Sequence, residues 1–103
     1  MLEGMENLIG RRLKDEYIEK NGQFIKDNGY IVTRPDFYSG NIHINMFIRF
    51  DEDFRVSDID GTKSYGCYRG LYNRSGSVTP RKFSKRDLAY LRRFVKNITN
   101  DPA

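Results

Sequence analysis

The chain is poor in the residues that build cross-links and metal sites. It contains one cysteine, Cys67, one histidine, His43, and no tryptophan. A single cysteine excludes an intramolecular disulfide and a thiolate cluster, and it fits a reducing compartment. One histidine and one cysteine are also too few for a zinc site. We therefore expect no bound metal and no cofactor.

Long apolar runs are missing as well. No run approaches the roughly 20 residues that a membrane-spanning helix needs. Residues 1–6 lack the basic segment followed by an apolar stretch that is typical of a signal peptide. These absences favour a cytoplasmic protein that makes no membrane contact. They leave open whether Met1 or Met5 is the native start.

Aromatic and charged residues are plentiful. The chain has seven Tyr and seven Phe, and 31% of its residues are charged. Bulky rings and periodic apolar segments in 103 residues are enough for one modest core. We expect a single compact domain over residues 1–103, with residues 1–5 and 100–103 frayed.

The charges are sorted along the sequence. Residues 69–100 hold nine Lys or Arg and a single acid, Asp87, whereas residues 1–68 hold nine cations and twelve acids. The C-terminal third is therefore strongly basic, although the whole chain carries a formal charge of only +4. Such a field attracts polyanions or an acidic protein surface.

The N-terminal third predicts a helix. Ile9, Leu13 and Tyr17 recur every four residues on one side of it. Asn28-Gly29 is typical of a helix C-cap, because Gly accepts the left-handed conformation that ends a helix. A shorter helix that ends at Asn21-Gly22, followed by a hairpin, is an alternative. We favour the longer helix.

Strand signals follow this helix. In residues 41–50 apolar side chains stand at every second position, which predicts a strand with one buried face; they are Ile42, Ile44, Met46, Ile48 and Phe50. Further strands are expected at residues 30–33, 54–56, 64–73 and 78–83, with turns at 51–53, 60–61 and 74–77. Pro80 places the last strand at an edge of the sheet or outside it.

The last helix is the best defined element. Ser84 is a suitable N-cap, and Asp87 can complete a capping box and complement the helix dipole. The helix runs from Lys85 to about Thr99. The order of elements predicts an α+β fold: an N-terminal helix, an antiparallel β-meander of about four to five strands, and a C-terminal amphipathic basic helix packed on the sheet.

This helix has two opposed faces. The apolar arc that we expect to face the core comprises Leu88, Leu91, Phe94, Val95 and Ile98. The opposite arc has Ala89 at its centre and is basic, with Lys85, Arg86, Arg92, Arg93 and Lys96. Arg forks suit phosphate oxygens, and like charges without interspersed acids repel one another. We therefore prefer a binding surface to a solvated helix with a basic bias.

More candidate residues precede the helix. They are Arg81 and Lys82 at its approach, and Tyr68, Arg69, Tyr72 and Arg74 in or next to a Tyr-rich strand. Rings that stand beside Gly on a sheet face can stack on unpaired bases, although they also pack ordinarily across strands.

An acidic segment lies earlier in the chain. It contains Asp51, Glu52, Asp53, Asp58 and Asp60, without the ordered ligand spacing of a calcium loop. We interpret it as a solvated loop. A contact with the basic helix, within the chain or in a dimer, is the alternative, and it would mask the helix from polyanions.

Three functions fit these observations. We favour a small nucleic-acid-binding protein, DNA or RNA, that uses the basic helix and the Tyr/Arg strand. The alternative is an interaction or inhibitor protein of the phage-regulator type, whose basic face plugs an acidic or nucleic-acid-binding surface of a larger protein. A metal-independent ribonuclease that uses Tyr68, Arg69, Arg74 and Lys82 is third, so we expect no enzyme. An open sheet face or edge is also compatible with a homodimer.

Overall fold

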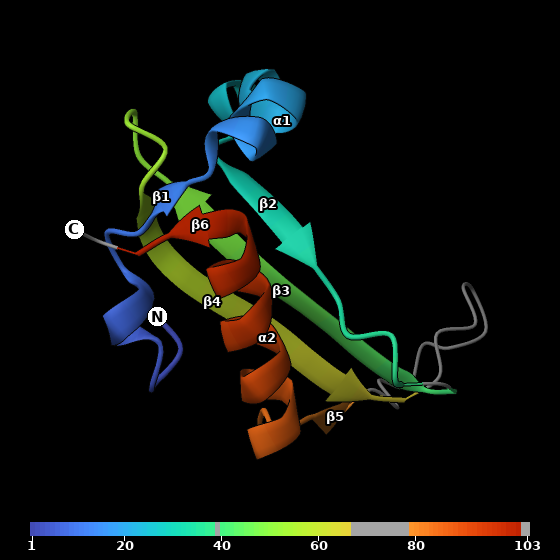
Figure 1. The fold of residues 1–103 in the computed structure, drawn as a ribbon. Coiled ribbons are helices and arrows are strands. Elements are labelled where there is room, and N and C mark those ends of the chain that lie inside the picture. Colours follow the sequence, from blue (N-terminus) through green and yellow to red (C-terminus); the bar gives the residue numbers. More distant parts are fainter. Residues whose placement is uncertain (39, 67–78, 102–103) are drawn as a thin grey trace.

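A computed structural model describes residues 1–38, 40–66 and 79–101 of the chain (Figure 1). The elements follow in the order η1 (Glu6–Leu8, a single 3-10 turn), β1 (Arg12–Leu13), α1 (Asp15–Asn28), β2 (Tyr30–Thr33), β3 (Ile42–Phe50), β4 (Val56–Tyr65), β5 (Thr79–Pro80), α2 (Lys85–Ile98) and β6 (Thr99–Asn100). The α+β prediction is confirmed, with an N-terminal helix, an antiparallel sheet and a C-terminal helix packed on it.

The main sheet has four antiparallel strands in the order β2-β3-β4-β5. Its centre is the long β3–β4 hairpin. Thr79 and Pro80 form the short strand β5 at one edge, as Pro80 predicted, because proline lacks the N–H that an inner strand would need. A separate two-stranded ribbon joins β1 to β6, and it brings the start of α1 beside the end of α2.

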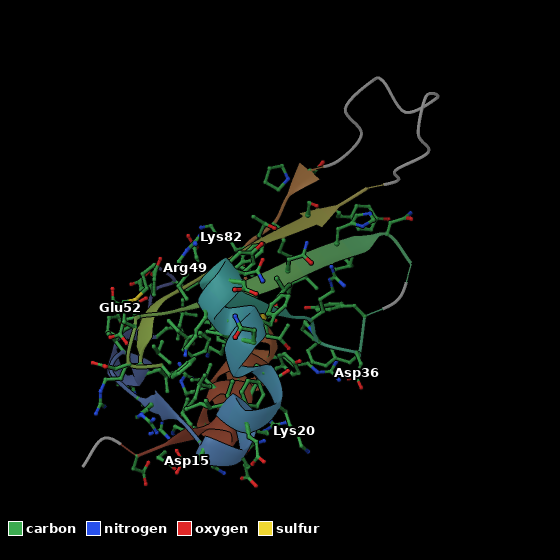
Figure 2. All side chains as sticks on the ribbon, turned by 90° about the horizontal axis from the view of Figure 1, so that it is seen from above. Asp15, Lys20, Asp36, Arg49, Glu52 and Lys82 are labelled. Atoms are coloured by element: carbon green, nitrogen blue, oxygen red, sulfur yellow. The ribbon has the colours of Figure 1, made fainter. Side chains whose placement is uncertain are left out.

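The helices lie on one side of this sheet. α2 crosses the inner face, where Ile44, Met46 and Ile48 of β3 are buried (Figures 1 and 2). Leu91 and Val95 of α2 are fully buried in the same core. The outer face, which carries Val32 and Arg49, has no helix over it within the described residues (Figure 2).

The N-terminal helix is shorter than its apolar periodicity predicted. α1 begins at Asp15, and the residues before it pair with other parts of the chain instead of with one another. The Leu13 N–H donates to the Phe54 carbonyl, and the Lys14 N–H donates to the Ile98 carbonyl. Gly10, at φ +90°, also interrupts any helix there. The end was predicted correctly, because α1 runs through Asn21-Gly22 to a left-handed cap at Gly29.

The first residues, which we expected to fray, pack onto the sheet. The Leu2 N–H donates to the Ile59 carbonyl at 2.8 Å, and Met5 and Leu8 are fully buried. Near the other terminus, Thr99 and Asn100 form β6, and Asp101 pairs with the buried guanidinium of Arg11 at 2.9 Å.

The turn predicted at Asp60-Gly61 is wrong. Both residues lie inside β4, which is one continuous strand with Gly61 opposite Met46. The glycine is required by close approach: a Cβ there would lie 2.7 Å from the Asn45 carbonyl and 2.9 Å from the Phe83 ring. Ser64 and Tyr65, the start of the strand predicted at 64–73, end β4 instead. Gly66 follows as a bend, and residues 67–73 of that prediction lie outside the described residues.

None of the helices in the described ranges has the length and apolar character required to cross a membrane.

Candidate functional site

The basic helix begins with the predicted capping box. The Asp87 N–H donates to the Ser84 hydroxyl at 3.2 Å, and the Ser84 N–H donates to the Asp87 carboxylate at 2.8 Å. Both bonds satisfy N–H groups that a helix start leaves without partners. The N-terminus of α2 is therefore already occupied by a carboxylate of its own.

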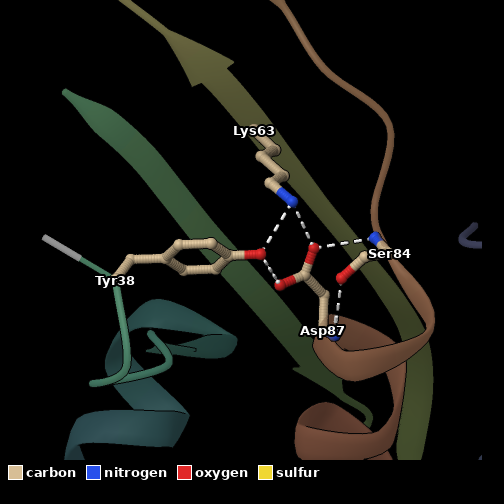
Figure 3. Close-up of polar contacts among 4 residues, drawn as sticks. All are labelled: Tyr38, Lys63, Ser84 and Asp87. Atoms are coloured by element: carbon tan, nitrogen blue, oxygen red, sulfur yellow. Dashed lines mark hydrogen bonds and ion pairs between the residues drawn. The ribbon is translucent and has the colours of Figure 1, made fainter.

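Asp87 is also the centre of a buried polar cluster that the sequence did not reveal (Figure 3). The Lys63 ammonium lies 2.6 Å from one carboxylate oxygen, and the Tyr38 hydroxyl donates to the other at 2.5 Å. Lys63 also donates to the Tyr38 hydroxyl at 2.8 Å. The Asp87 side chain is fully buried and the Lys63 side chain is 9% exposed. The cluster ties β4 and the loop after β2 to the start of α2.

The charges in this cluster stabilise each other. Burial by itself would raise the pKa of Asp87, but hydrogen bonds from Lys63, Tyr38 and Ser84 outweigh it and hold the pKa below its ordinary value. Burial would likewise lower the pKa of Lys63, and its bonds to Asp87 and Tyr38 outweigh that and raise the pKa. Both groups are therefore charged at neutral pH.

The apolar face of α2 lies where its periodicity predicted. Leu91 and Val95 are fully buried, and the other three predicted residues are half-buried against the core. Tyr90, which was not part of the predicted arc, also turns inward. Its hydroxyl hydrogen-bonds with Thr33 at 2.5 Å and donates to the Arg34 carbonyl at 2.9 Å.

The opposite face of α2 is basic and exposed. Together with its approach segment it carries six exposed cations, here named the basic surface: Arg81, Lys82, Lys85, Arg86, Arg93 and Lys96. None of the six forms an ion pair with another described residue. Ala89 is exposed among them, and its short side chain projects less than the surrounding Lys and Arg side chains.

Arg92 was predicted to belong to this surface, and the structure places it differently. It is half-buried, and its guanidinium donates to the Gly4 carbonyl at 3.3 Å. The long guanidinium side chain therefore helps to hold the N-terminal segment against α2, and it is less accessible than Arg93.

Two arginines of the basic surface lie over aromatic rings. The guanidinium carbon of Arg86 is 3.8 Å from the centre of the Phe37 ring, and that of Arg81 is 5.4 Å from the centre of the Tyr65 ring. Both distances are within the range of cation–π attraction. Neither ring was singled out in the sequence, because Phe37 lies in a loop and Tyr65 was grouped with a longer strand.

Four predicted site residues, namely Tyr68, Arg69, Tyr72 and Arg74, lie outside the described residues, as does Cys67. The stacking role proposed for the Tyr-rich strand is therefore not addressed by the described part of the chain. His43 lies on the outer face of β3, as predicted, and its Nε2 is 2.9 Å from the Gly66 carbonyl.

The acidic segment makes local hydrogen bonds. Asp51 accepts from the N–H groups of Asp53 and Arg55 within the β3–β4 turn, and the other two hydrogen-bonded acids, Asp58 and Asp60, each accept from the next residue's N–H. Among the described residues, none of these acids pairs with a cation of α2. Nor do the described ranges contain a cluster of three or more His, Cys, Asp or Glu suited to a metal ion.

Comparisons with protein-family models, with curated proteins and with solved structures find no match to this chain.

Proposed function

We propose that this protein binds nucleic acid through the basic surface. The observation that carries the proposal is the row of exposed cations along α2, which have no acidic partners among the described residues. Like charges held on one rigid helix repel one another. A bound polyanion neutralises this repulsion and releases its own counterions. Lys85 and Lys96 lie near opposite ends of α2, so the row follows the length of the helix.

The packing of α2 favours binding over catalysis. Leu91 and Val95 fix the helix on the sheet, and the cluster around Asp87 fixes its first turn. The fixed backbone of such a helix sets the spacing of its cationic residues before the ligand binds, which lowers the entropy lost on binding. Of the four residues considered for a ribonuclease, only Lys82 lies in the described residues, and it is exposed with no general base paired to it there.

Fluorescence anisotropy with labelled single- and double-stranded DNA and RNA tests the proposal. We expect binding that weakens steeply with salt and that is reduced at least about tenfold in Arg93→Glu/Lys96→Glu. Both side chains are exposed and form no ion pair with a described residue, so the variant should keep its fold. Circular dichroism checks that it does.

A matched control separates the surface from the net charge. Lys26→Glu/Arg49→Glu changes the total charge equally, but it alters α1 and the outer face of the sheet. We expect it to leave the affinity within about twofold of the original chain. Equal loss in both variants, or no binding of any nucleic acid at low salt, would contradict the proposal.

A second candidate is a protein partner, and the outer face of the sheet favours it. There Val32 is 43% exposed beside the half-buried rings of Tyr30 and Phe47, with no helix over them in the described ranges. An inhibitor could use such a face as well as the basic surface. Saturable binding to one protein that withstands salt and is lost in Val32→Asp, but not in Arg93→Glu/Lys96→Glu, would select this function.

A further inference from the structure

The two arginine–aromatic pairs flank the start of α2. Arg86 and Arg81 are both exposed, and Lys82 and Lys85 lie between them in the sequence. Tyr65 is 46% exposed at the end of β4. Both ring contacts therefore belong to this end of the basic surface, and at its other end Arg93 and Lys96 have no ring contact within the described residues.

The Phe37 ring is a fixed platform. It packs against Tyr38, with ring centres 4.9 Å apart, and forms a T-shaped pair with Tyr90, with ring centres 6.3 Å apart. Tyr38 is itself held by Asp87 and Lys63. The guanidinium carbon of Arg86 lies over this ring at contact distance, and Arg86 is an exposed residue.

The guanidinium plane of Arg86 over the Phe37 ring suits a flat base better than a phosphate. Unpaired bases stack on aromatic rings and on guanidinium planes, whereas the bases of a duplex are already stacked on one another. The start of α2 is a poor phosphate site, because the N–H groups of Ser84 and Asp87 are capped within the chain and the Asp87 carboxylate already lies there. Phosphate contacts are thus left to the four cations of the basic surface that lie over no described ring.

We propose that the basic surface takes single-stranded nucleic acid, with bases stacked on the Arg86–Phe37 pair and on Tyr65 and with phosphates along Lys82, Lys85, Arg93 and Lys96. This inference rests on the proposed function and names its substrate class. It assigns the stacking role to two rings that contact arginines of the basic surface in the described part of the chain.

The test compares an oligothymidine of about 12 nucleotides with an abasic oligomer of equal length, which has the same phosphates and no bases. We expect the original chain to prefer the oligothymidine by at least about fivefold. Arg86→Lys keeps the charge and loses the plane, and Tyr65→Leu loses an exposed ring. Each should reduce the preference while the affinity for the abasic oligomer stays within about twofold.

Arg93→Lys is the matched control, because it makes the same replacement where no described ring is in contact. It should leave the preference for bases unchanged. Equal binding of both oligomers by the original chain, an unchanged preference in both Arg86→Lys and Tyr65→Leu, or tighter binding of a duplex of the same length would each overturn the inference while leaving nucleic-acid binding intact. No binding of any oligomer would overturn the proposed function itself, and this inference with it.

Discussion

At the scale of single residues, Asp87 has two roles that share one carboxylate. It completes the capping box with Ser84, and it balances the buried ammonium of Lys63. Helix N-termini favour negative charge, so the dipole of α2 also stabilises the Asp87 carboxylate. The same carboxylate that begins the basic helix therefore also anchors it to β4 and to Tyr38.

Removal of both charges of this pair should cost less than the sum of the two single removals. Lys63→Met leaves a buried carboxylate without its cation, and Asp87→Asn leaves a buried ammonium without its anion. We expect each to lower the free energy of unfolding by about 3 kcal/mol. Lys63→Met/Asp87→Asn should lose clearly less than the sum of the two. Urea unfolding of the three variants measures this, and strictly additive losses would show that the two charges do not interact.

The same pair predicts a pH dependence. Because the pKa of Asp87 is lowered on folding, its contribution to stability is present above about pH 4 and is lost as the pH falls through the folded pKa. Because the pKa of Lys63 is raised, its contribution is present below about pH 10 and is lost as the pH rises through the folded pKa. Unfolding midpoints between about pH 2 and 7 should fall more steeply for the original chain than for Lys63→Met/Asp87→Asn. Parallel curves would exclude this origin of the acid sensitivity.

At the scale of elements, the ends of the helices are decided by local chemistry. α1 ends at Gly29, whose φ of +80° lies in the left-handed region. A Cβ at this glycine would meet nothing within 4 Å, so the conformation alone calls for glycine. α2 begins at Ser84 for an equally local reason, since its partner Asp87 lies within the first turn.

This geometry gives a prediction for the α1 cap. Gly29→Ala should lower the free energy of unfolding by about 1 kcal/mol, because alanine is strained at this φ and no new contact compensates. Gly29→Asn should cost less, since asparagine tolerates the left-handed region. Thermal or urea unfolding of both variants checks the order. An alanine variant as stable as the asparagine variant would mean that the cap relaxes.

Local signals also explain which elements were predictable. Both helix caps and the alternation of β3 are read from neighbouring residues, and the structure confirms them. β4 was missed because Asp60-Gly61 has the composition of a turn. The glycine is instead required by the close approach of the neighbouring strand and of the Phe83 ring, 22 positions away in the sequence. The tertiary approach outweighs the turn propensity, and no local pattern carries that information.

The residues of the candidate site likewise fall into those that local patterns predict and those that they do not. The exposed cations of α2 follow from helical periodicity, and the structure places four of the five predicted arc residues in the open, with Arg92 partly buried. The Phe37 and Tyr65 platforms could not be predicted, because each ring meets its arginine across a separation that no local pattern spans. Lys63 was hidden for a related reason: a lysine on an inward strand position is explained only once Asp87 is known to face it.

At the scale of the whole molecule, the fold separates charges of opposite sign. α2 covers the inner face of the sheet (Figure 1) and carries exposed cations, whereas Asp58 and Asp60 share the outer face of β4. The sheet and its core lie between the two groups. Masking of the basic surface by these acids within one chain is therefore absent among the described residues, and a polyanion can reach α2 without displacing them.

This separation leads to a prediction about salt. Each phosphate neutralised on a single strand changes the slope of log K against log salt by about −0.7, so six cations set a limit of about −4. Lys85→Gln and Lys96→Gln should each flatten the slope by about 0.7, because each removes one phosphate contact. Lys26→Gln removes the same charge from α1, where the ammonium lies 5.8 Å from the centre of the Phe54 ring, and should leave the slope unchanged. Anisotropy titrations at several salt concentrations measure all three slopes. If Lys26→Gln flattened the slope as much as Lys96→Gln does, the ligand would be sensing the net charge of the protein, and α2 would not be its binding surface.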